Sequence, residues 1–366
     1  MSPTKERFTA IGLMSGTSAD GVDGALLETD GVEVFRTGAS TMLPYADTLR
    51  DRLFAVMRDP ALAETGEFAE LERDLAAANA AVVTDVLTRE GIAAEAVDVI
   101  GFHGQTVLHR PERRLTRQLG DGAWLSKLAG IPVVNRFRDA DVAAGGQGAP
   151  LVPVYHAALA RQLAGPLAIL NLGGVANVTL IDGERLLAFD TGPASALLDD
   201  WVRRHTGAAY DDGGRIAAAG RIDESRLVGL LADLYFDRAP PKSLDRNDFP
   251  LAAMDGLSLE DGAATLLAFT ARSVAKARAH LGVVPKRWLV TGGGRHNTAL
   301  MAALAEALDG VEVSPVETVN WVGDTLEAQA FAFLAVRSLK GLPLSLPGTT
   351  GVPYPMPGGL LHQPAP

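Results

Sequence analysis

Four turns rich in glycine and hydroxyl side chains are the parts of this sequence best suited to chemistry. Each follows a short apolar run: MSGTS (14–18), HGQT (103–106), NLGGVAN (171–177) and TGGG (291–294). Backbone N–H groups in such turns can surround phosphate oxygens, and Ser or Thr hydroxyls add further donors. None of the four matches the P-loop or the GxGxxG dinucleotide motif. One such turn alone is more often structural, but the set of four favours a nucleotide held by its phosphates.

Three carboxylates next to these turns could add to that chemistry. Asp20 and Asp23 follow MSGTS, and either could hold Mg²⁺ through water, because this small cation keeps much of its hydration shell. Capping of the turn is the structural alternative for both. Asp190 ends the apolar run RLLAFD, and we expect Pro193 to open a helix just after it. The dipole of that helix would favour an ionised carboxylate, which could take a proton from an attacking group during phosphoryl transfer. A helix cap is the alternative role for Asp190.

The elements that must position these residues repeat along the chain. In the first half, hydrophobic spacing predicts strands at 8–14, 22–28, 32–42, 97–104 and in IPVVNRF, and helices at 66–90 and 121–129. In the second half it predicts two strands joined by a glycine turn within 167–181, a third at 185–190 and another at 287–294, and a helix follows each of the last two. The order β-β-β-α-β-α therefore occurs roughly twice. It predicts two related α/β halves, each a mixed sheet flanked by helices, with a ligand cleft between them. Residues 341–366 are rich in Pro and Gly and predict an irregular tail.

Composition excludes several classes of function. The chain has 366 residues, enough for two domains, and a net charge of -11, which argues against a nucleic-acid surface. It contains no cysteine, so disulfides and thiolate chemistry are excluded. The start MSPTKERFTA lacks the apolar stretch of a signal peptide, and no apolar run predicts a membrane span. We therefore expect a cytoplasmic protein without nucleic-acid or membrane partners.

Seven motifs together resemble one family. GLMSGTSADGVD, HGQTVLH, VAAGGQGAPLVP, NLGGVANV, FDTGP, PKS and TGGG occur in the order seen in anhydro-N-acetylmuramic acid kinases, and the resemblance runs from about residue 10 to 350. That family belongs to the superfamily of sugar kinases, actin and heat-shock chaperones. The resemblance implies two ribonuclease-H-like domains with a nucleotide cleft, which we place at 1–150 and 151–366. It leaves open that the C-terminal tail packs back on the first domain, and that the protein is a homodimer.

The resemblance also implies an activity and its nucleotide site. Such a kinase uses ATP and Mg²⁺ to phosphorylate O6 of 1,6-anhydro-N-acetylmuramic acid while water opens the anhydro ring, which yields N-acetylmuramic acid 6-phosphate in peptidoglycan recycling. Asp190 would be the catalytic base, and Asp20 would hold Mg²⁺ through water. The implied nucleotide residues are Gly16, Thr17, Ser18, Ala19, Asp20, Gly21, Val22, Asp23, Gly173, Gly174, Asn177, Gly292, Gly293 and Gly294.

Five further residues are candidates for binding the sugar or its phosphate. The amides of Gln105 and Gln147 can both donate to and accept from hydroxyls, and His103 ends a strand beside them. Arg138 could bind the lactyl carboxylate of a muramic sugar, and Lys242 could reach phosphate. The structural alternatives are a packed histidine at 103, a surface ion pair at 138 and a solvated lysine at 242.

Three departures from the family pattern bear on the sugar. Ala194-Ser195 stand where Gly-Asn usually follows FDTGP, Arg136 replaces an Asp, and Leu244-Asp245 replace Thr-Gly after PKS. Ala194-Ser195 and Arg136 favour one alternative, a kinase for another sugar or sugar acid. A separate alternative is a nucleotide-switched protein of the same superfamily without enzymatic activity.

Overall fold

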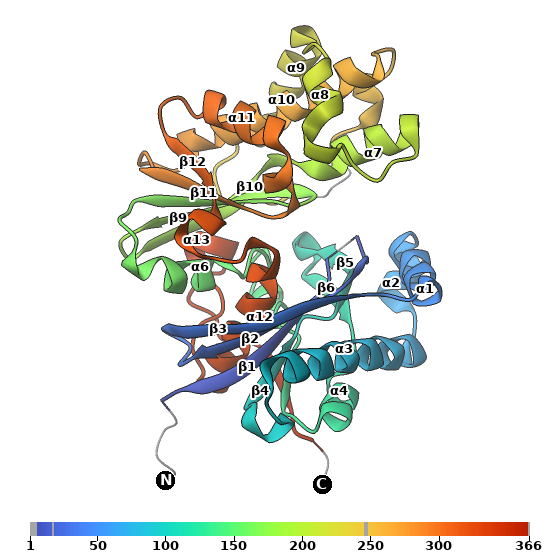
Figure 1. Cartoon of the computed structure of the whole chain (residues 1–366), viewed down its shortest axis with the longest axis vertical. Helices are drawn as coiled ribbons and strands as arrows, with labels where there is room; N and C mark the ends of the chain where they lie inside the picture. The colour runs from blue at the N-terminus through green and yellow to red at the C-terminus, as the bar shows by residue number, and fades with distance from the viewer. Residues whose placement is uncertain (1–5, 17, 245–247, 365–366) are drawn as a thin grey trace. The chain divides into compact units, whose positions relative to one another are not determined.

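The computed structural model describes residues 6–16, 18–244 and 248–364, and the chain divides into two compact units (Figure 1). Unit 1 contains Met1–Arg161 and Thr325–Pro366, and unit 2 contains Gln162–Asp324. The boundary predicted at residue 150 differs from this division, although the prediction left open that the C-terminal tail packs back on the first domain. Residues 325–366 belong to unit 1 because helix α12 (Leu326–Leu339) packs against strands of the first sheet.

The sheet of unit 1 has six strands in the order β13-β7-β4-β1-β2-β3. The first three strands form an antiparallel meander, β4 and β7 continue the sheet in parallel beyond β1, and β13 closes the edge antiparallel to β7. A separate hairpin joins β5 and β6. The bounds are β1 Phe8–Met14, β2 Gly21–Thr29, β3 Val34–Pro44, β4 Val99–Phe102, β5 Gln105–Arg110, β6 Leu115–Leu119, β7 Val133–Asn135 and β13 Leu360–His362.

Helices cover both faces of this sheet. Gly24 faces α3 (Ala69–Glu90), where an added Cβ would lie 2.3 Å from the side chain of Val82. On the opposite face, a Cβ on Gly12 or Gly101 would lie 1.8 Å or 2.0 Å from backbone oxygens of α12, so these two glycines let that helix approach closely. The remaining helices of unit 1 are α1 Asp47–Met57, α2 Pro60–Thr65, α4 Gly122–Ala129, α5 Asp139–Ala143, α6 Pro153–Leu159 and α13 Pro347–Thr350.

The sheet of unit 2 has five strands in the order β10-β9-β8-β11-β12. Its strands are β8 Leu167–Leu172, β9 Val175–Asp182, β10 Arg185–Pro193, β11 Arg287–Thr291 and β12 Glu312–Pro315. Its helices are α7 Ser195–Thr206, α8 Arg215–Ala219, α9 Glu224–Leu231, α10 Leu259–Ala277 and α11 Thr298–Ala307. Helix α10 is buried along most of its length, and its apolar side chains join those of α7 and the sheet in one core.

The two sheets share one topology, which confirms the prediction of two related α/β halves. In each, an antiparallel meander (β1-β2-β3 or β8-β9-β10) is followed by strands parallel to its first member (β4 and β7, or β11 and β12). Gly16, and Gly173 with Gly174, therefore lie between the first two strands of the two meanders. The turns at 103–106 and 291–294 follow the first parallel strand of each sheet.

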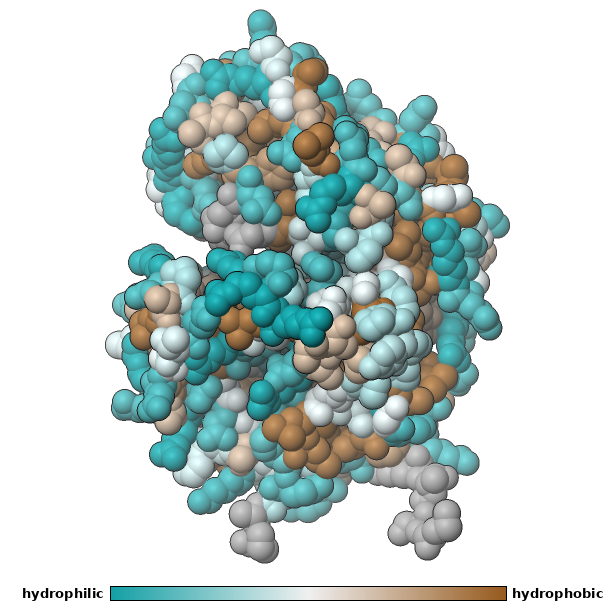
Figure 2. Space-filling view, turned by 180° about the vertical axis from the view of Figure 1, so that it is seen from behind, coloured by the Kyte–Doolittle hydropathy of each residue, from teal (hydrophilic) through white to brown (hydrophobic). Residues whose placement is uncertain are grey.

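The surface in Figure 2 is mostly hydrophilic, with apolar side chains in small groups among polar ones. Among the described residues, the most exposed large apolar residue is Leu234, at 78%. Within the described ranges, no helix combines the length and apolar character that crossing a membrane requires.

Candidate functional site

The first glycine turn presents an open backbone. Gly16 and Ser18 are exposed, and an added Cβ on Gly16 would have only Ser18 Oγ nearby, at 3.8 Å. The next residue, Ala19, is buried with φ 49, a conformation uncommon outside glycine, and its N–H donates to Gly16 O at 3.1 Å. Thr17, also predicted to bind phosphate, lies outside the described residues. The turn thus leaves room for a ligand beside its backbone.

Gln105 supports this turn through hydrogen bonds from both ends of its side-chain amide. It is fully buried, its Oε1 accepts from Ser15 Oγ at 2.7 Å, and its Nε2 donates to Gly16 O at 2.9 Å. Both ends of the amide therefore hold the turn. The structure gives Gln105 a supporting contact with the predicted phosphate loop instead of an open face toward a sugar.

The predicted nucleotide run from Gly16 to Asp23 divides into a loop and a strand. Gly21, Val22 and Asp23 are residues of β2; a Cβ on Gly21 would meet Leu43 O at 2.4 Å, and Val22 is buried in the core. These contacts explain Gly21 and Val22 by packing. Asp23 is partly buried, and its backbone pairs with Met14.

Asp20 is the exposed carboxylate of the loop. Its side chain is 63% exposed and its Oδ1 accepts from Arg50 at 2.7 Å. Among the described residues, no cluster of three or more His, Asp or Glu side chains could hold a metal ion. Magnesium in kinases is bound by one or two carboxylates together with phosphates and water, so a single exposed carboxylate fits a water-mediated contact but not a protein cage.

His103, which is buried, and Arg138, which is partly buried, form a hydrogen-bonded pair in unit 1. His103 Nδ1 donates to Gly104 O at 2.8 Å, and its Nε2 accepts from Arg138 at 3.0 Å. Burial, helped by the nearby guanidinium, holds the pKa of His103 well below 6.5, so the ring is neutral. Arg138 also donates to Gly148 O at 2.6 Å. His103 thus orients Arg138 and the end of the GGQG loop (145–148).

A buried carboxylate that the sequence analysis missed anchors this loop. Asp141 accepts from the N–H of Gly148 at 2.6 Å, from Thr350 Oγ1 at 2.5 Å and from Ser345 Oγ. The backbone of Gln147 donates to Thr350 O at 2.7 Å. Asp141 therefore connects the loop that carries Gln147 to the C-terminal segment. Ser345 and Thr350, its partners in that segment, stand in no motif that would predict this contact.

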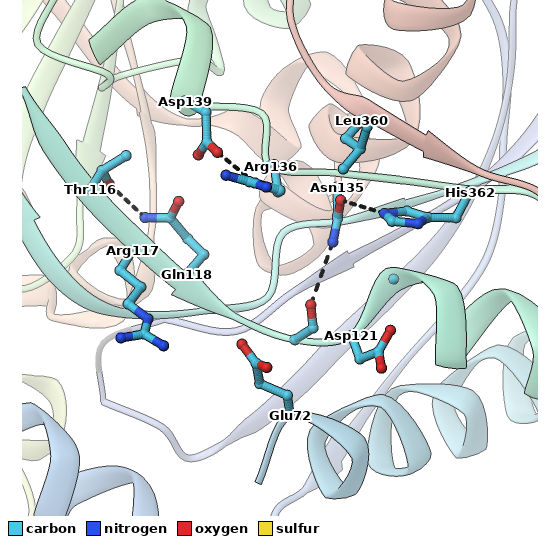
Figure 3. Close-up of a pocket in the computed structure, with 12 residues that line it drawn as sticks. Glu72, Thr116, Arg117, Gln118, Asp121, Asn135, Arg136, Asp139, Leu360 and His362 are labelled. Carbon is cyan, nitrogen blue, oxygen red and sulfur yellow. Dashed lines mark hydrogen bonds and ion pairs between the residues drawn. The ribbon is translucent and has the colours of Figure 1, made fainter. Parts of the chain in front are cut away.

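A polar pocket of about 320 Å³ lies elsewhere in unit 1, with none of Asp141, Gly148, Ser345 or Thr350 in its lining (Figure 3). Residues of β6, of the turn into α4, of the segment after β7 and of β13 line it. It contains none of the predicted sugar-binding residues, but it contains Arg136, the departure from the family pattern. Arg136 takes φ 55 and donates to Asp139 Oδ2 at 2.6 Å, while His362 Nε2 lies 3.0 Å from Asn135 Oδ1.

In unit 2, four polar residues form a row across four strands. Asp190 on β10 lies opposite Asn177 on β9, Asn177 lies opposite Asn171 on β8, and Asn171 pairs with Thr291 on β11. Directly opposed residues share one face of a sheet. The row runs beside the turns at 173–174 and 292–294. Asn171 and Thr291 were not among the predicted residues, although both flank a predicted glycine turn.

Hydrogen bonds hold both the carboxylate and the backbone of Asp190 in place. Its Oδ2 accepts from the N–H of Leu244 at 2.8 Å, its own N–H donates to Lys242 O at 3.2 Å, and its carbonyl accepts from the hydroxyl of Tyr235 at 2.6 Å. Burial raises the pKa of Asp190 to about 7, against the opposing effect of the Leu244 N–H. The carboxyl can therefore take up and release a proton near neutral pH.

The expectation that Pro193 opens a helix is wrong. Strand β10 continues to Pro193, which pairs with Val175 beyond a register shift after Asp190, and α7 begins only at Ser195. Continued pairing with β9 keeps this stretch extended. Asp190 is therefore a strand residue and does not cap α7.

The second glycine turn is held against the start of α7. Ser195, another departure from the family pattern, donates from both Oγ and N–H to Gly173 O, at 2.6 Å and 3.0 Å. A Cβ on Gly173 would lie 3.7 Å from Val175 O, an ordinary contact, whereas one on Gly174 would lie 3.3 Å from Ala196 Cβ. Gly173 therefore has open space beside it that a side chain could fill.

In the TGGG turn, Gly293 alone has open space where a side chain would lie. A Cβ on Gly292 would lie 2.4 Å from Asn171 Oδ1, and one on Gly294 would lie 2.7 Å from Leu172 Cβ. Gly293 has no atom within 4 Å of that position. Packing accounts for Gly292 and Gly294, and Gly293 is free to face a ligand.

Lys242 does not point toward solvent. It is 4% exposed, and its Nζ donates to the carbonyls of Tyr235 and Phe236 at 3.1 Å and 3.3 Å. The solvated-lysine alternative is therefore excluded. Its contacts favour a structural role near Asp190 over the predicted contact with phosphate.

Two sequence comparisons with known proteins agree on one family. A sequence model of anhydro-N-acetylmuramic acid kinase matches residues 8–362. The anhydro-N-acetylmuramic acid kinase of Rhodospirillum rubrum is 56% identical over 352 residues, which cover 96% of this chain and 93% of that protein. The one from Paramagnetospirillum magneticum is 57% identical over 359 residues, covering 97% and 99%. Among solved structures, component A of (R)-2-hydroxyglutaryl-CoA dehydratase from Acidaminococcus fermentans aligns with a TM-score of 0.49 at 14% identity, covering 91% of this chain and 99% of that one. A TM-score and a sequence identity this low support no conclusion about this chain.

Proposed function

The chain belongs to the anhydro-N-acetylmuramic acid kinase family, and on that premise we propose that it phosphorylates 1,6-anhydro-N-acetylmuramic acid at the expense of ATP. The observation that carries the proposal is Asp190, a carboxyl with a pKa of about 7 in a polar row beside an open glycine turn. A base poised near the working pH is what general-base catalysis requires. We propose that the reaction takes place in the cytoplasm, where ATP is available, as a step of peptidoglycan recycling.

The chemistry of the acceptor defines the role of the base. A 1,6-anhydro sugar has no free 6-hydroxyl, so a water molecule attacks C1 while O6 leaves C1 and binds the γ-phosphorus of ATP. Asp190 takes the proton of the attacking water. The products are ADP and N-acetylmuramic acid 6-phosphate. Capture of O6 by the phosphoryl group removes the need for a strong general acid at the leaving oxygen.

The open turns supply the proposed nucleotide contacts. The exposed backbone at Gly16 and Ser18 and the open space at Gly173 fit the close approach of phosphate oxygens to N–H groups. Asp20 would hold Mg²⁺ through water, and that ion would neutralise phosphate charge when bound with ATP. Its exposed position lets it exchange the contact with Arg50 for one to hydrated metal.

Arg138 is the proposed contact for the lactyl carboxylate of the sugar. Its guanidinium uses three N–H groups on His103 and Gly148, and it has five in all. His103 and Asp141 would act on the sugar indirectly, by orienting Arg138 and the loop that carries Gln147.

Product analysis tests the proposal directly. The protein is incubated with ATP, Mg²⁺ and 1,6-anhydro-N-acetylmuramic acid, and the sugar is analysed by mass spectrometry. We expect its mass to increase by one water and one phosphoryl group, with ATP consumption that depends on the sugar. Arg136, in the pocket of Figure 3, favours one alternative, a kinase for another sugar acid. Turnover of a panel of sugar acids without turnover of the anhydro sugar would support that alternative, and ATP hydrolysis indifferent to sugar would contradict both.

A further inference from the structure

The buried ammonium group of Lys242 fastens a short segment of unit 2 onto neighbouring backbone. Its Nζ donates to the carbonyls of Tyr235 and Phe236, both in the 3₁₀ turn η5 (Leu234–Asp237). The same nitrogen lies 4.7 Å from the ring centre of Tyr235 and 5.5 Å from that of Phe189 on β10. An ammonium over aromatic faces gains further attraction when it is desolvated. Lys242 therefore holds residues 242–244 against both η5 and β10.

The η5 turn and residues 242–244, which Lys242 joins, both contact Asp190 directly. The hydroxyl of Tyr235 donates to the carbonyl of Asp190 at 2.6 Å, and the carbonyl of Lys242 accepts from the N–H of Asp190 at 3.2 Å. Two residues further on, the N–H of Leu244 donates to Oδ2 of Asp190 at 2.8 Å. The lysine thus closes a ring of contacts around the backbone of Asp190 and one oxygen of its carboxylate.

We propose that Lys242 is a positioning residue for the reaction, which sets the orientation of the Asp190 carboxylate through residues 242–244. This inference rests on the proposed role of Asp190 as the base. A direct role on phosphate would require Nζ to leave two carbonyls and two aromatic faces, from a side chain that is 4% exposed. The charged groups that act on Lys242 are Arg238, Asp237 and Lys276, all in unit 2.

The test compares Lys242→Met with Lys276→Met. Lys276 is a matched control, because its Nζ also donates to a backbone carbonyl, of Leu231 at 3.0 Å, and contacts η5 at the ring of Phe236 (5.6 Å) and at Asp237 (3.6 Å). Among the described residues, however, its contacts do not join η5 to residues 242–244. For Lys242→Met we expect kcat to fall about tenfold or more, with the KM for ATP changed less than about twofold, since the loss affects the reacting geometry alone. Lys276→Met should retain the kcat of the wild type.

A second readout does not depend on turnover. The carboxyl ¹³C shift of Asp190, followed against pH, gives its pKa in each variant. Loss of the Leu244 N–H bond should raise this pKa in Lys242→Met and leave it unchanged in Lys276→Met. Wild-type protein without sugar-dependent turnover would overturn the proposed function, and the ¹³C titration would still decide the positioning contact. An unchanged kcat and an unchanged titration, or a KM for ATP that rises while kcat is kept, would overturn the role of Lys242.

If Lys242→Met fails to fold, Tyr235→Phe tests the same support. It removes the hydroxyl bonded to Asp190 and keeps the ring beneath the ammonium. We expect a severalfold lower kcat with an unchanged KM for ATP. Wild-type kcat in that variant would overturn the proposal.

Discussion

Burial raises the pKa of Asp190 and the N–H bond from Leu244 to Oδ2 lowers it, which together leave that pKa at about 7. A base works only when it is deprotonated, so kcat/KM for the sugar at saturating ATP should rise about tenfold per pH unit below pH 7 and level off above it. A pH–rate profile from about pH 5 to pH 9 measures this. A rate that stays constant down to pH 5, as an aspartate with an ordinary pKa would give, would contradict the buried base.

Gln105 should affect ATP more than sugar. Both ends of its amide hold the first glycine turn, so Gln105→Leu leaves Ser15 and the carbonyl of Gly16 without their buried partner. An unsatisfied buried polar group costs about 1–3 kcal/mol, enough to disorder the turn. We expect the KM for ATP to rise about tenfold or more, with a small change in the KM for sugar. The opposite pattern in steady-state kinetics would return Gln105 to the sugar site.

At the scale of elements, the glycines of these turns differ in whether packing leaves room for a side chain. Gly292 and Gly294 are required by packing, whereas Gly173 and Gly293 have room for a side chain. A methyl group at Gly173 should therefore leave the fold intact and occupy the position proposed for phosphate. We expect Gly173→Ala to weaken ATP binding about tenfold or more in calorimetry, with an unchanged melting temperature.

The control for this variant is Gly229→Ala. Gly229 lies exposed on α9 and has no atom within 4 Å of an added Cβ, so the same substitution there should leave ATP binding intact. Wild-type ATP affinity in a folded Gly173→Ala protein would remove this turn from the phosphate site. Gly174 is a poorer test, because a Cβ there already meets Ala196 at 3.3 Å.

Local patterns predicted the elements well but not their long-range contacts. Helical spacing located α3, and the apolar runs located β1, β4 and β8, because burial of one face imposes its period on neighbouring residues. The glycine turns were also recognisable from composition. The anchoring of Asp141 was not, since its hydroxyl partners Ser345 and Thr350 lie 204 and 209 residues away. The end of β10 was missed because pairing with β9 outweighed the local preference of Pro193.

At the scale of the whole molecule, the sequence left open that the C-terminal tail packs back on the first domain, but it did not indicate that α12 belongs to unit 1. The sequence of α12 is plainly helical and apolar, but nothing local says which sheet it covers. That choice is made by Gly12 and Gly101, whose missing side chains let α12 approach backbone to backbone. Such complementarity joins positions more than 200 residues apart and has no periodic signature.

Nucleotide binding should stabilise the molecule as a whole. A ligand that binds only the folded state at about 100 times its Kd adds roughly 2.7 kcal/mol, which corresponds to a rise in melting temperature of about 5–10 °C. We therefore expect a non-hydrolysable ATP analogue with Mg²⁺ to raise the melting temperature in calorimetry, and to do so far less for Gly173→Ala. A saturating analogue without any effect on the wild type would contradict nucleotide binding.

The most direct test of the account is turnover by Asp190→Asn. The amide keeps the shape and can still accept from the Leu244 N–H, but it cannot take a proton from water. We expect sugar-dependent turnover to fall by a factor of roughly 10² to 10⁴, with ATP affinity unchanged or slightly higher. Because the pKa of Asp190 is raised on folding, its ionisation costs stability as the pH rises from about 4 to 7, so at pH 8 the variant should melt no lower than the wild type. A folded Asp190→Asn protein with wild-type turnover would contradict the account.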